Sequence, residues 1–159
     1  MSIFTSRFSN PELRKGCYTA VRISLGSPRW DVGYRISGEL KELMPFGLKG
    51  RYDDDYDGFR REYYARLNRT GVGHILQQLQ RFDPAHNDIV LLCYEDIRKP
   101  ENWCHRSMFA DWWMEHTGEL IEELTDPSGM KVSNPPKSDS KPLQESGIQL
   151  PIYEQLSFI

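Results

Sequence analysis

The pattern of apolar and polar residues along the chain predicts strands that alternate with helices. Residues 88–94 (DIVLLCY) form a continuous apolar run of strand length, which is typical of a central parallel strand buried on both faces. Residues 18–25 (YTAVRISL) are rich in β-branched side chains and run into a Gly-Ser-Pro turn, which predicts another strand. A short apolar start at residues 2–4, followed by a polar turn over residues 5–10, predicts the first strand. Strands separated by helices favour a small three-layer α/β domain with a mostly parallel sheet.

Apolar residues at spacings of three and four predict the helices between these strands. Gly118 is expected to end the last helix, and residues 119–124 fit either a final strand or another helical turn. The helices are expected at residues 38–43, 57–69, 70–82 and 106–116, with Asp57 and Thr70 as the N-caps of the second and third.

The composition changes near residue 126. The last 33 residues hold five of the ten prolines, and most of this stretch lacks large apolar side chains that could offset the entropy of ordering it. We therefore expect one folded domain over residues 1–126, a mobile linker over 127–147 and an apolar C-terminal peptide over 148–159.

The end of that peptide resembles a known docking motif. Gln155, Leu156, Phe158 and Ile159 are similar to the short peptide by which bacterial replication and repair proteins dock on the sliding clamp, although the order of the last two residues differs. The resemblance implies a sliding clamp as a partner. The alternative is that the peptide folds back onto its own domain, which a short tether favours.

Composition and charge narrow the class of protein. The chain of 159 residues is 38 % hydrophobic and 27 % charged, which is typical of a globular protein and excludes disorder of the whole chain. No apolar run approaches the ~18 residues of a membrane span, and the N-terminus lacks a secretory signal pattern, so we expect a cytoplasmic protein without membrane contact. Residues 1–81 carry 14 Lys and Arg against 9 Asp and Glu, whereas residues 82–126 carry 3 against 11. This asymmetry fits either solvated surfaces or a basic half that meets a nucleotide or nucleic acid.

The candidate chemistry lies after the central strand. Cys93 ends that strand, Glu95 follows, and Cys104-His105-Arg106 opens the next helix. A thiol at a helix N-terminus or beside a cation loses its proton more easily, and the thiolate is a nucleophile. We therefore expect Cys93 or Cys104 to be the nucleophile and His105 and Glu95 to carry protons. The alternatives are that Cys93 only fills the core and that His105 only bonds a backbone carbonyl.

An anion-binding pocket is expected beside these cysteines. Helix-start amides and a guanidinium group can hold an oxyanion such as phosphate, which makes Arg106 and Ser107 candidates. Arg7 and Arg22 follow the first two strands at the same edge of the sheet and are expected either to complete this pocket or to pair with surface acids.

This segment resembles the active-site region of the rhodanese–phosphatase superfamily, in which a buried strand ends in the catalytic Cys and a helix begins with Arg-Ser. Residues 91–95 (LLCYE) and 104–107 (CHRS) are more similar still to the domain of unknown function 488 family. The resemblance covers residues 3–125 and implies a rhodanese-like fold and a role in nucleic-acid modification or sulfur transfer. Thirteen positions separate Cys93 from Arg106, whereas phosphatases of that fold use six, which argues against ordinary phosphatase activity.

Two functions from different classes therefore stay open. The first is a cysteine-dependent enzyme acting on a nucleotide or nucleic acid, and the second is a non-catalytic module that binds the same partners. A zinc site formed by Cys17, Cys93, Cys104 and His105 is a further option, but no two cysteines have the usual zinc-ligand spacing of two to four residues between them. We expect no cofactor and no metal.

Overall fold

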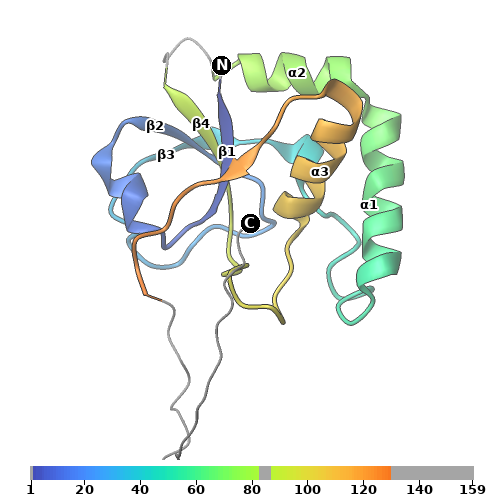
Figure 1. Ribbon diagram of the computed structural model, residues 1–159, viewed down its shortest axis with the longest axis horizontal. Coiled ribbons are helices and arrows are strands. Elements are labelled where there is room, and N and C mark those ends of the chain that lie inside the picture. Colours follow the sequence, from blue (N-terminus) through green and yellow to red (C-terminus); the bar gives the residue numbers. More distant parts are fainter. Residues whose placement is uncertain (1, 83–86, 130–159) are drawn as a thin grey trace, which may run out of the picture. The chain divides into compact units, whose positions relative to one another are not determined.

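The computed structural model describes residues 2–82 and 87–129 (Figure 1). They form an α/β fold around a sheet of five parallel strands in the order β3-β2-β4-β1-β5. The predicted central strand, β4, lies in the middle of the sheet, where parallel strands are covered on both faces. The strands are β1 (Ile3–Arg7), β2 (Tyr18–Arg22), β3 (Ile36–Glu39), β4 (Asp88–Cys93) and β5 (Glu122–Glu123).

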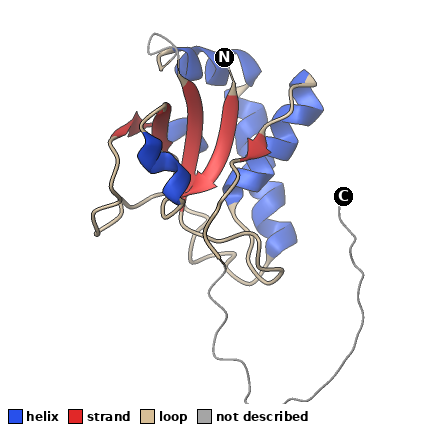
Figure 2. Ribbon diagram, turned by 60° about the vertical axis from the view of Figure 1, so that its left-hand side comes forward, coloured by secondary structure: helices blue, strands red, loops and turns tan. Residues whose placement is uncertain are grey.

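Three α-helices cover one face of this sheet, and Figure 2 shows them together on one side of the strands. A second apolar cluster on the opposite face includes Leu13 from a short 3-10 helix and Val32 from the loop after β2. The helices are α1 (Tyr56–Thr70), α2 (Val72–Gln80) and α3 (His105–Thr117), and the 3-10 helices are η1 (Pro11–Lys15) and η2 (Lys41–Leu43).

Side chains of β4 alternate between these two cores. Ile89 and Leu91 pack in the helix-covered cluster, whereas Val90 and Leu92 pack in the opposite one. Since successive side chains of a strand point to opposite faces, Cys93 falls on the helix side with Ile89 and Leu91.

Helix α1 begins and ends at positions other than those predicted. The side chain of Asp55, rather than Asp57, accepts a hydrogen bond from the Gly58 amide at 2.8 Å and caps the helix. Thr70 is the last residue of α1 and not a cap, since its hydroxyl donates to the Arg66 carbonyl. Gly71, at a φ of +85°, makes the turn between α1 and α2 that a side chain would strain.

The structure corrects the predictions for residues 38–43 and for residues 5–10, and it decides between the two alternatives for residues 119–124. Residues 38–43 do not form a helix, because Ile36–Glu39 pair with β2 and only Lys41–Leu43 are helical. Thr5, Ser6 and Arg7 continue β1 instead of turning, because all three pair with β4 and Thr5 also pairs with β5. Gly118, with a φ of +76°, ends α3 as predicted, and Glu122–Glu123 then form a strand rather than a helical turn.

The compact unit runs to Ser128, two residues beyond the predicted domain end. The predicted docking residues Gln155, Leu156, Phe158 and Ile159 lie outside the described residues, as does most of the predicted linker. Within residues 2–82 and 87–129, no helix has the length and apolar character needed to cross a membrane.

Candidate active site

Two cysteines and a histidine meet at the carboxyl edge of the sheet. Cys93 is the last residue of β4, which lies between β2 and β1. Cys104 is the extended N-cap residue of α3, and His105 is the first residue of that helix. The long loop between β4 and α3 thus brings the start of α3 close to the end of β4. All three side chains are buried, with exposures of 4 % for Cys93, 3 % for Cys104 and 5 % for His105.

The three side chains converge on one atom, Nδ1 of the imidazole. The Sγ atom of Cys93 lies 3.8 Å from His105 Nδ1, and the Sγ atom of Cys104 lies 3.7 Å from it. Sγ of Cys93, Sγ of Cys104 and a His105 ring nitrogen all lie within 4.8 Å of one another. The structure therefore brings together three of the four predicted catalytic residues.

The other ring nitrogen of His105 fixes the protonation pattern. Nε2 lies 2.7 Å from the carbonyl oxygen of Ile23, just beyond β2. Because a carbonyl oxygen only accepts, Nε2 carries a proton, and in the neutral ring Nδ1 presents its lone pair to the sulfurs. Tyr63 holds the ring from α1 in an edge-on contact, with the ring centroids 5.7 Å apart. The expected hydrogen bond between His105 and a backbone carbonyl is present, and it leaves Nδ1 free to accept a proton.

The two thiols differ in their tendency to ionise. The pKa of Cys93 is raised by its hydrogen bond with Cys104 and by burial. Burial also opposes the charge on Cys104, but its hydrogen bonds with Cys93 and His105 and the nearby positive charge of Arg106 outweigh it and hold the pKa of Cys104 well below its ordinary value. Cys104 therefore gives up its proton more readily than Cys93.

Glu95, the fourth predicted catalytic residue, joins this cluster through Cys93. Its Oε1 atom lies 3.4 Å from the Cys93 Sγ, and its other oxygen lies 3.6 Å from Nζ of Lys49. A carboxylate accepts hydrogen bonds, so Cys93 has three acceptors within reach, Glu95, Cys104 and Nδ1 of His105.

Two cavities reach the cluster. A cavity of about 210 Å³ is lined by Cys104 and His105 together with Lys49, Asp53, Phe59, Glu95, Glu101, Asn102 and Trp103. A smaller one of about 70 Å³ is lined by Cys93 and His105 together with Ser24, Leu25, Gly26, Pro45, Lys49 and Tyr94. Each cysteine thus lines a cavity, although both side chains are buried.

Arg106 holds the start of α3 in place. Its guanidinium group is fully buried and pairs with Glu123 of β5, with Nε at 3.0 Å and Nη2 at 2.8 Å from the two carboxylate oxygens. Nη2 also donates to the Glu95 carbonyl at 2.7 Å. Among the described residues, Nη1 of Arg106 is the one buried side-chain nitrogen or oxygen atom that lacks a hydrogen-bond partner. Arg106 therefore ties helix, sheet and loop together.

The predicted anion pocket is not assembled by Arg7 and Arg22. The register places Arg22 beside Leu92, on the sheet face opposite to Cys93, and its Nη2 pairs with Glu39 at 2.6 Å. Arg7 lies beside Cys93, but its Nε pairs with Asp126 at 2.7 Å. The structure therefore shows the other alternative, in which both arginines pair with acidic side chains.

Ser107, the remaining candidate for anion binding, lies in the first turn of α3. Its backbone amide donates to the Cys104 carbonyl at 3.1 Å, so this amide is engaged within the helix. Arg7, Arg22 and Arg106 thus all pair with carboxylates and do not come together to form the predicted anion pocket.

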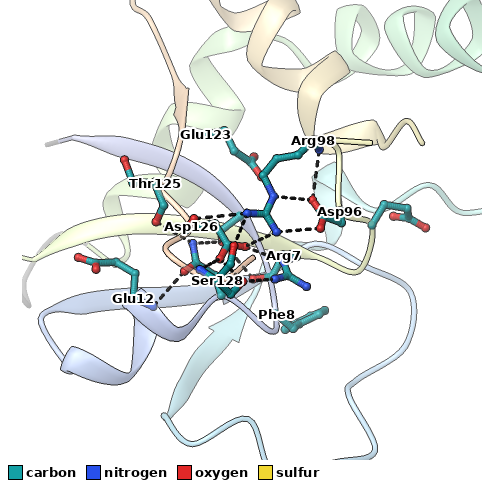
Figure 3. A network of polar contacts seen from close by, with 12 residues as sticks. Arg7, Phe8, Glu12, Asp96, Arg98, Glu123, Thr125, Asp126 and Ser128 are labelled. Atoms are coloured by element: carbon teal, nitrogen blue, oxygen red, sulfur yellow. Dashed lines mark hydrogen bonds and ion pairs between the residues drawn. The ribbon is translucent and has the colours of Figure 1, made fainter. Parts of the chain in front are cut away.

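A network that the sequence did not reveal fixes the loop after β4 (Figure 3). Nε and Nη2 of Arg98 each lie 2.9 Å from a carboxylate oxygen of Asp96, and Nη1 donates to the Ser128 carbonyl at 2.7 Å. Arg7 donates to the Ser128 hydroxyl and pairs with Asp126. The hydrogen bond from Arg98 lowers the pKa of Asp96 to about 2. The network joins three segments far apart in the sequence, so no local pattern could have indicated it.

Aromatic side chains beside the two cavities were also missed. Trp30 is 48 % exposed and lies against Tyr94, with the ring centroids 6.0 Å apart. Tyr56 is 43 % exposed and contacts Trp103 edge-on, with the centroids 5.4 Å apart. Tyr94 lines the smaller cavity and Trp103 the larger one. Aromatic rings therefore flank both cavities.

Comparisons with protein-family models, curated proteins and solved structures find no match to this chain. The resemblance to the domain of unknown function 488 family and to rhodaneses therefore stays a prediction.

Proposed function

We propose that the protein is a cysteine-dependent enzyme that acts on a nucleotide or nucleic acid, with Cys104 as the nucleophile. The observation that carries this proposal is the position of the Cys104 sulfur. It lies 3.7 Å from the free Nδ1 atom of His105, and Cys104 lines a cavity of about 210 Å³. A nucleophile beside an oriented base and an accessible space is the arrangement that covalent catalysis requires.

The roles follow from the hydrogen bonds. Nδ1 of His105 takes the thiol proton of Cys104, because Nε2 is held by the Ile23 carbonyl. The thiolate attacks a substrate R–X, so that an S–R bond forms, the R–X bond breaks, and the leaving group departs as HX with the proton from His105. An acceptor H–Y then gives its proton to Nδ1 and its Y group to R. The S–R bond breaks, and the proton returns from His105 to Cys104.

Nucleobase binding is supported by the surroundings of the cluster. Trp30, Tyr94 and Trp103 offer aromatic faces and edges, and bases stack on such rings. The larger cavity is lined by three carboxylates and one lysine, which favours a neutral base with amino donors over a phosphate inside it. The phosphate groups of the substrate would then lie outside this cavity.

A mass-change screen tests the proposal. Nucleotides and single-stranded oligonucleotides are incubated with the full chain in the presence of a chelator, and their masses are compared before and after. We expect a mass change with the wild type and with Cys17→Ala, whose cysteine is exposed and outside the cluster. Cys104→Ala should show none. A product formed equally by Cys104→Ala would refute the role of this cysteine.

One observation favours the second function, a non-catalytic module that binds the same partners. Both sulfurs belong to side chains that are no more than 4 % exposed, which also suits cysteines that only pack. In that case Cys104→Ala would bind a nucleotide as the wild type does, and neither protein would change its mass. Equilibrium binding measured beside the mass screen separates the two functions.

A further inference from the structure

The donor atoms of the cysteine–histidine cluster are spaced as in a tetrahedral metal site. Zinc binds thiolate sulfur at about 2.3 Å and imidazole nitrogen at about 2.0–2.1 Å, so a tetrahedral angle separates these two donors by about 3.5–3.6 Å. The distances from His105 Nδ1 are 3.8 Å to Cys93 Sγ and 3.7 Å to Cys104 Sγ. Both distances exceed this separation by only a few tenths of an ångström, and the two sulfurs lie within 4.8 Å of each other.

The histidine is oriented as metal-binding histidines are. Such a residue usually donates its second ring N–H to a carbonyl or carboxylate, which fixes the tautomer and directs the lone pair at the metal. Nε2 of His105 donates to Ile23 in this way, and Tyr63 fixes the ring from the side. This outer shell comes from Ile23, just beyond β2, and from α1.

The fourth coordination position is available. Cys104 and His105 line the cavity of about 210 Å³, and Glu95 lines the same cavity. An oxygen of Glu95 lies 3.4 Å from Cys93 Sγ, close to the separation expected of two ligands on one tetrahedral ion. Either this carboxylate or a water molecule from the cavity can complete the set.

We propose that Cys93, Cys104 and His105 bind one Zn²⁺ ion per chain. Two thiolates and an imidazole suit zinc, whereas the hard cations Mg²⁺ and Ca²⁺ require oxygen ligands. The sequence argued against zinc because the cysteines lack the usual spacing, but here one ligand ends a strand and the other two open a helix eleven positions later. Cys17 is exposed and does not belong to this set.

Zinc at this position also has a consequence for the reaction. A thiolate that binds the ion shares its charge with the metal and attacks a substrate more slowly, so Zn²⁺ should slow the enzyme. This part of the inference rests on the proposed function, whereas metal binding itself does not.

Cobalt provides the direct test, because Co²⁺ bound to thiolates absorbs in the near ultraviolet. The full chain is stripped with a chelator, kept anaerobic and titrated with Co²⁺ and then with Zn²⁺. We expect thiolate-to-cobalt absorption that saturates at one ion per chain and disappears when Zn²⁺ is added. Cys93→Ser and Cys104→Ser should weaken binding by more than about 100-fold, beyond the effect of losing an outer-shell contact. Cys17→Ser should bind as the wild type does.

A second measurement needs no variant and so does not depend on variant folding. The wild type is treated with N-ethylmaleimide with and without Zn²⁺, and the modified cysteines are identified by peptide mass. Zinc should protect Cys93 and Cys104 and leave Cys17 reactive. The inference is overturned if no thiolate-to-cobalt absorption appears, or if Zn²⁺ protects neither buried cysteine. Substrate turnover by the metal-free wild type is measured separately, so that turnover without metal binding refutes the zinc site alone, and metal binding without turnover refutes the proposed function alone.

Discussion

Removal of the Glu123 carboxylate should destabilise the domain, because it leaves a buried guanidinium group without its counter-charge. Glu123 accepts two hydrogen bonds from Arg106 and one from the Thr5 hydroxyl at 2.8 Å. In Glu123→Ala the guanidinium group keeps only the Glu95 carbonyl as a partner in the described part of the chain. The interaction thus joins α3, β5, β1 and the loop after β4.

The size of the effect follows from burial. Breaking a fully buried ion pair on one side costs about 3–5 kcal/mol. The Arg106 side chain is fully buried, but that of Glu123 is 30 % exposed, so water can replace part of the lost interaction. We expect the free energy of unfolding to fall by about 2–3 kcal/mol. With a urea m-value of about 1–3 kcal/mol/M, the midpoint of unfolding should move down by about 0.7–3 M.

Urea denaturation followed by tryptophan fluorescence measures this shift, since Trp112 and Trp113 are buried in the helix-covered core. Glu122→Ala is the matched control, because the neighbouring glutamate lies on the same strand, is exposed and should change stability by no more than about 0.5 kcal/mol. The double variant Arg106→Met, Glu123→Leu removes both charges and should recover part of the loss. If Glu123→Ala and Glu122→Ala unfold within 0.5 M of each other, the argument from the buried charge is refuted.

Three further predictions concern other parts of the chain. Asp96→Asn should lower stability by about 1 kcal/mol at neutral pH, after allowance for solvent screening. Because the Asp96 pKa is depressed to about 2, urea midpoints of the wild type and this variant should converge as the pH falls from 4 to 2, and a constant difference would contradict the pairing with Arg98. Tyr63→Phe should lower stability by about 1–2 kcal/mol in thermal unfolding, because the buried Leu43 carbonyl loses its 2.6 Å hydrogen bond, and an unchanged melting temperature would exclude that contribution. A labelled peptide of residues 150–159 should bind a purified sliding clamp in fluorescence anisotropy more tightly than a scrambled peptide, and equal binding would remove the clamp as a partner.

The elements that define the fold were readable from local patterns. The apolar run of β4 indicated a central parallel strand, and Gly118 indicated the end of α3. Both signals are local, since period-two burial and a left-handed helix end depend on neighbours a few residues away. The short strand β3 gave no such signal, because Ile36–Glu39 become a strand only by pairing with β2.

In the candidate site too, the ends of the strand and the helix were predictable from the sequence, whereas the contacts between distant residues were not. The sequence by itself determined that Cys93 ends the central strand and that Cys104 and His105 open a helix, because hydrophobic periodicity sets the ends of these elements. Their meeting at one imidazole nitrogen, and the bond of that imidazole to Ile23, eighty-two positions earlier in the chain, were decided only by the tertiary structure. The same holds for Arg22, which looked free to bind an anion and instead faces Glu39. Partners of polar groups are chosen where segments distant in sequence pack together, and a local pattern carries no information about that choice.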